Sequence, residues 1–165
     1  MGVLAGEGSA AGEAGLVLDQ AARDLLEPEV AALRAQVADP ATARGLEALA
    51  AALGEGVVAG AAVDALEWVL RLGIETGRFE RVHGRAADTL ARELWARTPA
   101  GRAAAEQAAA VTAALSALRG AVLEAIRVAP DGPGGERWTL ETDRGTVSLR
   151  SDRRGIRVES LEVGR

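Results

Sequence analysis

Apolar residues recur every three to four positions through the first 128 residues of the chain, a spacing typical of helices with one buried face. The first series starts near Gly15 and places Val17, Ala21 and Leu25 on one side. Pro28 follows, and a proline there either kinks a helix or begins a new one. The pattern therefore predicts one long helix, or two shorter ones, in this stretch.

Two further helices are predicted at residues that commonly begin a helix. Asp39 can accept a hydrogen bond from the first turn, and Pro40 after it has the backbone angle of a first helical residue. Thr98 and Pro99 repeat this arrangement and open the last helix, which we expect to run to about Arg127. A short amphipathic helix is predicted over residues 85–97.

The segment 58–78 is apolar on most of its helical circumference, and its polar residues fall in one narrow stripe. A helix of this kind is usually covered on several sides. We therefore expect it to be central, covered by its neighbours or by a second copy of itself. The residues that would form such an interface are Leu66, Trp68 and Leu70.

Beyond residue 137 the pattern changes to alternation with a period of two, which predicts strands. Glycine-closed turns at 143–145 and 152–155 divide this region into three strands. The expected fold class is α+β, a bundle of about five helices followed by a C-terminal three-stranded antiparallel β-meander. The expected domain organisation is a flexible Gly-rich leader over 1–15, the bundle over 16–128, a Pro/Gly linker over 129–136, and the meander over 137–165, packed on the bundle.

Composition narrows the chemistry that this chain can perform. It has no cysteine, lysine or tyrosine, which excludes disulfides, thiolate metal sites, Schiff bases and tyrosine acids. The net charge of −5 argues against nucleic-acid binding, and no signal peptide or membrane span is evident. We expect a cytoplasmic protein without cofactor or metal, from a GC-rich, bacterial genome that favours alanine and arginine.

The segment 74–88, "IETGRFERVHGRAAD", contains the only histidine and the only phenylalanine. Arg78, Arg81, His83 and Arg85 could hold a phosphate-bearing ligand, because guanidinium groups and free helix N–H groups both favour anions. The structural interpretation, which we favour, is a corner between two helices plugged by Phe79 and Val82. Its arginines would then pair with nearby carboxylates.

Catalytic patterns are weak in this sequence. "ERVH" over 80–83 has the Glu-x-x-His spacing of di-iron bundles, but a single copy cannot complete such a site. No nucleophile elbow is present, and a phosphate loop of the P-loop type needs a lysine. An enzyme that combines His83 with Glu80 and Asp88 stays an open alternative.

The function that these observations favour is a non-enzymatic interaction or scaffolding protein. It would act through helix-mediated self-association, or through binding of another protein, without nucleic-acid or membrane partners. The alternative is a sensor or carrier of a small anion at the 78–85 corner. A second basic region, "RSDRRGIR" over 150–157, is interpreted as a solvated turn, with a docking patch for an acidic partner as its alternative.

Overall fold

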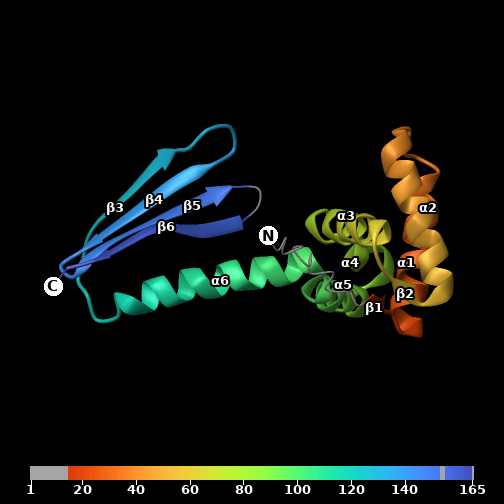
Figure 1. Cartoon of the computed structure of the whole chain (residues 1–165), viewed down its shortest axis with the longest axis horizontal. Coiled ribbons are helices and arrows are strands. Elements are labelled where there is room, and N and C mark those ends of the chain that lie inside the picture. The colour runs from red at the N-terminus through yellow and green to blue at the C-terminus, as the bar shows by residue number, and fades with distance from the viewer. Residues whose placement is uncertain (1–14, 153–154, 165) are drawn as a thin grey trace, which may run out of the picture. The chain divides into compact units, whose positions relative to one another are not determined.

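The computed structural model describes residues 15–152 and 155–164, so most of the expected leader over 1–15 and the pair 153–154 lie outside the described residues. The chain forms two compact units, Met1–Thr98 and Pro99–Arg165. We describe each unit by itself, and Figure 1 labels their elements. The sequence interpretation had instead placed the boundary between helices and strands at 129–136.

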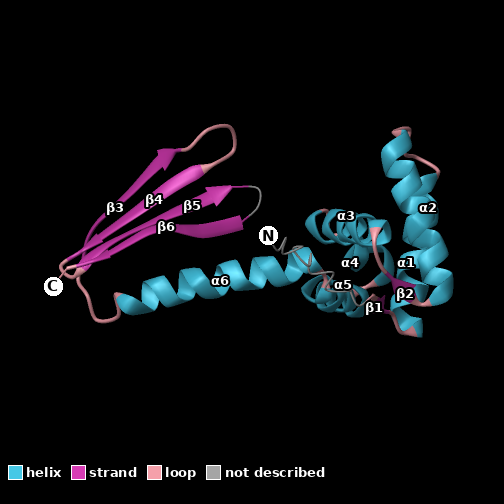
Figure 2. Ribbon diagram, viewed as in Figure 1, coloured by secondary structure: helices cyan, strands magenta, loops and turns pink. Residues whose placement is uncertain are grey.

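Unit 1 is helical, with one very short sheet (Figure 2). Its helices are α1 (Gln20–Arg34), α2 (Pro40–Glu55), α3 (Ala61–Glu75), α4 (Arg78–His83) and α5 (Arg85–Arg97). Strands β1 (Leu16–Val17) and β2 (Val57–Val58) pair antiparallel. Among the described residues, no helix is both long enough and apolar enough to cross a membrane.

The start of unit 1 differs from the expected helix at Gly15. Residues 16 and 17 form β1, and α1 begins only at Gln20, because the Asp19 side chain accepts a hydrogen bond from the Ala22 N–H. Pro28 lies inside a continuous α1 rather than starting a second helix.

The predicted cap of α2 is confirmed, since the Asp39 carboxylate accepts a hydrogen bond from the Thr42 N–H at 2.8 Å.

The core of unit 1 surrounds α3, which contacts α2, α5 and α4. Leu66 and Leu70 are fully buried there, beside leucines of α1, α2 and α5. The apolar part of the circumference of α3 is therefore buried largely by helices of the same unit.

Unit 2 consists of α6 (Pro99–Ala117) and a four-stranded antiparallel sheet. The strands are β3 (Leu123–Pro130), β4 (Glu136–Thr142), β5 (Gly145–Asp152) and β6 (Gly155–Val163), paired in that order. Figures 1 and 2 show α6 beside β6, with β3 at the far edge of the sheet. The α+β class is confirmed, but the sheet has four strands where three were predicted.

The additional strand, β3, replaces the end of the predicted last helix. That helix stops at Ala117 instead of Arg127, and Gly120 follows with a φ of 77°, a backbone angle that ends helices. The segment 129–136 was expected to be a linker between two parts of the chain, but it lies within the sheet. It comprises the end of β3, a turn closed by a hydrogen bond from the Asp131 N–H to the Gly135 carbonyl, and the start of β4.

The sheet has one apolar and one polar face, because opposite residues in an antiparallel pair point the same way. Val128, Trp138, Leu149 and Val158 form one such row across all four strands. Ala114 and Leu118, at the end of α6 and just beyond it, pack on Val147 and Leu149 of β5 and on half-buried neighbours. The apolar face is therefore the one that α6 covers.

Candidate functional site

The corner at α4 is organised around a buried carboxylate that the sequence interpretation did not consider. Glu29 lies on α1, and its side chain is only 5% exposed. Arg78 Nε donates a hydrogen bond to Glu29 Oε2, and His83 Nε2 lies 2.8 Å from Glu29 Oε1. Since Arg78 and His83 both belong to α4, the carboxylate connects α4 to α1 through both of its oxygens.

The environment of Glu29 keeps this carboxylate ionised. Burial by itself raises the pKa of Glu29, but hydrogen bonds from Arg78 and His83 oppose it, and the resulting pKa lies below the ordinary 4.5. The Glu29 hydrogen bond in turn raises the pKa of Arg78. Arg78 therefore forms its ion pair with a carboxylate of the same chain rather than with an external anion.

Two glycines and one aromatic ring set the position of α4. Gly77 and Gly84 have φ angles of 64° and 87°, so the chain can turn sharply before and after this short helix. Phe79 is buried against Gly73 of α3, where a Cβ atom would lie 2.2 Å from the Phe79 ring. Phe79 plugs the corner as predicted. The same prediction for Val82 is wrong, since Val82 is 54% exposed.

The four residues predicted to bind an anion do not converge. Arg78 and His83 meet on Glu29, whereas Arg81 and Arg85 are exposed and form no side-chain ion pair with another described residue. Gly84 separates α4 from α5, so the arginines do not share one helical face. Nor do the described residues contain three or more carboxylates and histidines grouped to hold a metal ion.

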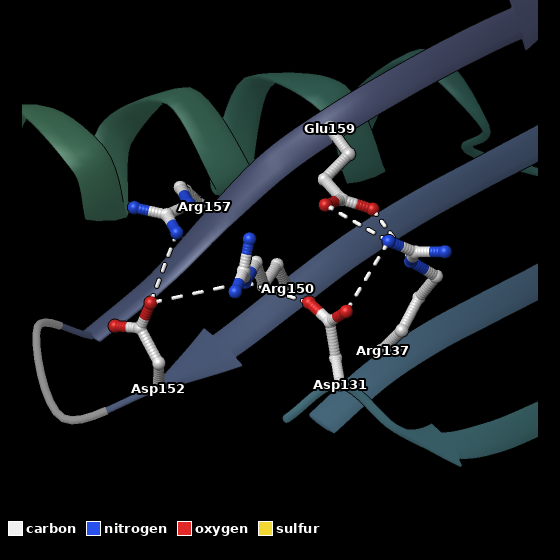
Figure 3. A network of polar contacts seen from close by, with 6 residues as sticks. All are labelled: Asp131, Arg137, Arg150, Asp152, Arg157 and Glu159. Atoms are coloured by element: carbon white, nitrogen blue, oxygen red, sulfur yellow. Dashed lines mark hydrogen bonds and ion pairs between the residues drawn. The ribbon is translucent and has the colours of Figure 1, made fainter. Parts of the chain in front are cut away.

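The polar face of the sheet carries an alternating network of arginines and acids (Figure 3). Its members are Asp131, Arg137, Arg150, Asp152, Arg157 and Glu159. Arg150 lies 2.7 Å from Asp131, Arg157 lies 2.9 Å from Asp152, and Arg137 lies 2.8 Å from Glu159. Since the three arginines are matched by three acids, the described part of the basic turn presents no excess of positive charge. Arg153 and Arg154 lie outside the described residues.

The predicted interface on α3 is not available as a surface. Leu66 and Leu70 have no exposed area, and only Trp68 is partly exposed. These two leucines are core residues of unit 1, and the pattern that suggested an interface reflects burial among neighbouring helices.

The apolar face of the sheet is covered unevenly within unit 2. Its covered part includes Val147 and Leu149 on β5, which are 0% and 8% exposed. On β3, Ile126 is 53% and Val128 51% exposed, and Trp138 on β4 is 39% exposed. We call Ile126, Val128 and Trp138 the open apolar face. The Trp138 indole N–H donates to Glu136, so its ring can be buried further without an unpaired donor.

A second exposed surface of unit 2, made of small uncharged residues, lies on α6. From Gln107 to the end of the helix at Ala117 no residue is charged, on any side of the helix. Ala114 is buried on the sheet, and Val111 is partly buried beside it. The opposite side, about half a helical turn away, carries Ala105, Ala109, Thr112 and Ser116, which are exposed. We call these four residues the outer side of α6.

No protein-family model matches the chain, and the comparisons with curated proteins and with solved structures each gave no match either.

Proposed function

We propose that this chain is a non-enzymatic, cytoplasmic interaction protein of bacterial origin that acts by self-association through α6 and the adjoining sheet. The observation that carries the proposal is the charge-free stretch of α6 over 107–117, of which only one side is buried in unit 2. Because no side of this stretch carries a charge, a partner can pack on its exposed side without burying an ion. The open apolar face provides a second exposed surface without charge, made of large apolar side chains.

The anion-binding alternative has less support. It needs Arg78 and His83 to present positive charge to a ligand, and both groups contact the buried Glu29. The remaining candidates, Arg81 and Arg85, lie on an exposed surface and on separate helices. An exposed arginine pair contributes little binding energy in physiological salt.

The proposal is tested by a charge placed on the outer side of α6. Ala109→Glu keeps a good helix-forming residue but places a carboxylate in the surface that we expect to be buried on assembly. Burying an unpaired carboxylate costs several kcal/mol. We therefore expect the dissociation constant of the assembly, measured by sedimentation velocity, to rise at least 100-fold.

Ala96→Glu is the matched control, because Ala96 is also an exposed helical alanine but belongs to α5 of unit 1. This variant should assemble like the parent chain. A parent chain that sediments as a monomer at tens of micromolar contradicts the proposal. An equal rise of the dissociation constant in Ala109→Glu and Ala96→Glu would also contradict the proposal, because it would show an effect of net charge alone.

A further inference from the structure

We infer that the occupant of the open apolar face is α6 of a second copy of this chain. The inference rests on the proposed self-association and specifies its geometry. In the resulting two-fold dimer, the outer side of each α6 lies on β3 and β4 of the other copy. Each α6 would then be enclosed between its own sheet and that of its partner.

The sheet is about two helices wide, and unit 2 provides only one helix. Neighbouring strands lie about 4.8 Å apart, so a helix about 10 Å in diameter covers two of the four strands. In unit 2, α6 packs against β6 and β5. The open apolar face lies on the two remaining strands, β3 and β4, which together have the width of one more helix. On the same face of β6, Ile156 and Leu161 are also 49% and 38% exposed, so α6 does not cover β6 along its whole length.

The length and shape of α6 fit that strip. With 19 residues α6 is about 28 Å long, and β3 with 8 residues is about 26 Å long. The open apolar face presents large side chains, whereas the outer side of α6 presents small ones, so the two surfaces can approach closely. The Thr112 hydroxyl already donates to the Ala108 carbonyl, and its burial therefore leaves no donor unpaired.

The helix–sheet contact alone is smaller than a standard protein–protein interface, which fits a weak dimer. A helix footprint about 28 Å long and 10 Å wide covers roughly 280 Å². Each copy would contribute one such area from its sheet and one from its helix, or about 560 Å². A standard interface buries about 800 Å² per partner, and the contact between the two neighbouring α6 helices would add to the helix–sheet area.

The absence of cysteine allows a specific cross-linking test on the 165-residue chain. One preparation carries Ala109→Cys on the outer side of α6, and a second carries Val128→Cys on the open apolar face. The two are mixed, allowed to exchange subunits, and treated with a short bis-maleimide. The control replaces the second variant with Arg127→Cys, because residue 127 is adjacent on β3 but points to the polar face. Mass spectrometry then identifies which chains are joined.

The expected result is a linked pair of the 109 and 128 variants, with at least tenfold less product for the 127 control. A dimer that links only the 128 variant to itself indicates pairing of β3 edges or of open faces, and overturns this geometry. A dimer without the 109–128 product also overturns it, while self-association itself still stands. A monomer in sedimentation overturns both the geometry and the proposed function.

Discussion

Replacing Glu29 with glutamine preserves the shape of the side chain and removes the charge that connects α1 to α4. In the structure this carboxylate accepts from Arg78 and contacts His83 at 2.8 Å, and it is almost completely buried. A glutamine at this position can still accept one hydrogen bond, but its amide group cannot repeat both charged contacts.

The expected cost follows from the two contacts. A hydrogen bond to a charged group contributes about 1.5–3 kcal/mol, and a neutral one about 0.5–1.5 kcal/mol. Weakening both contacts of Glu29 would cost roughly 2–3 kcal/mol in a fully buried site. The side chains of Arg78 and His83 are 42% and 25% exposed, so water can replace part of what is lost. We therefore expect Glu29→Gln to lower the free energy of unfolding of unit 1 by about 2 kcal/mol.

Urea unfolding followed by tryptophan fluorescence measures this difference. A Trp138→Phe background confines the signal to Trp68 and Trp95, which both belong to unit 1. Glu27→Gln is the matched control, because Glu27 lies on the same helix but is exposed. Equal stability of the two glutamine variants would refute the role assigned to Glu29.

Three further predictions concern packing, pH and ligands. Gly73→Ala should lower the free energy of unfolding of unit 1 by about 1–3 kcal/mol, because the new Cβ would overlap the Phe79 ring. Gly54→Ala, which has open space around it, should instead raise it by about 0.5 kcal/mol. Urea unfolding measures both values, and equal effects of the two substitutions would contradict the role of Gly73. Because the pKa of Glu29 is lowered on folding, its contribution should be complete above about pH 4.5 and decline as the pH falls through the folded value. The difference in unfolding free energy between the parent chain and Glu29→Gln should therefore shrink from about pH 5 to pH 3, and a constant difference over this range would contradict the role of Glu29. Phosphate-bearing compounds should leave the melting temperature unchanged, and an increase that Arg81→Ala abolishes would favour the anion alternative.

Local sequence signals predicted the α+β class and several helix starts, because these depend on neighbouring residues. Asp39 with Pro40 illustrates this, since a side-chain cap and a preset backbone angle act within one turn. The helical spacing of Leu115, Leu118 and Val122, by contrast, continued past the true end of α6. Gly120 was the available stop signal, and the alternation of residues 126–128 was the available strand signal.

The candidate site was harder to predict, because its central residue lies about 50 positions away from its partners. Glu29 follows Leu25 and Leu26 at helical spacing, so it stands on the buried side of α1, where a carboxylate needs a partner. That signal could have indicated a buried ion pair, but not which of the 19 arginines completes it. Similarly, the apolar pattern of α3 could not distinguish burial by its own neighbours from burial by a second copy.

Self-association through unit 2 is tested most directly by native mass spectrometry of the 165-residue chain. We expect a dimer with twice the 16.9 kDa mass of the chain, without a bound small molecule, and a return to the single-chain mass in Ala109→Glu. A single-chain mass at tens of micromolar for the unmodified protein would contradict self-association. A monomer that retains a small anionic ligand would favour the corner at Arg81 and Arg85 instead.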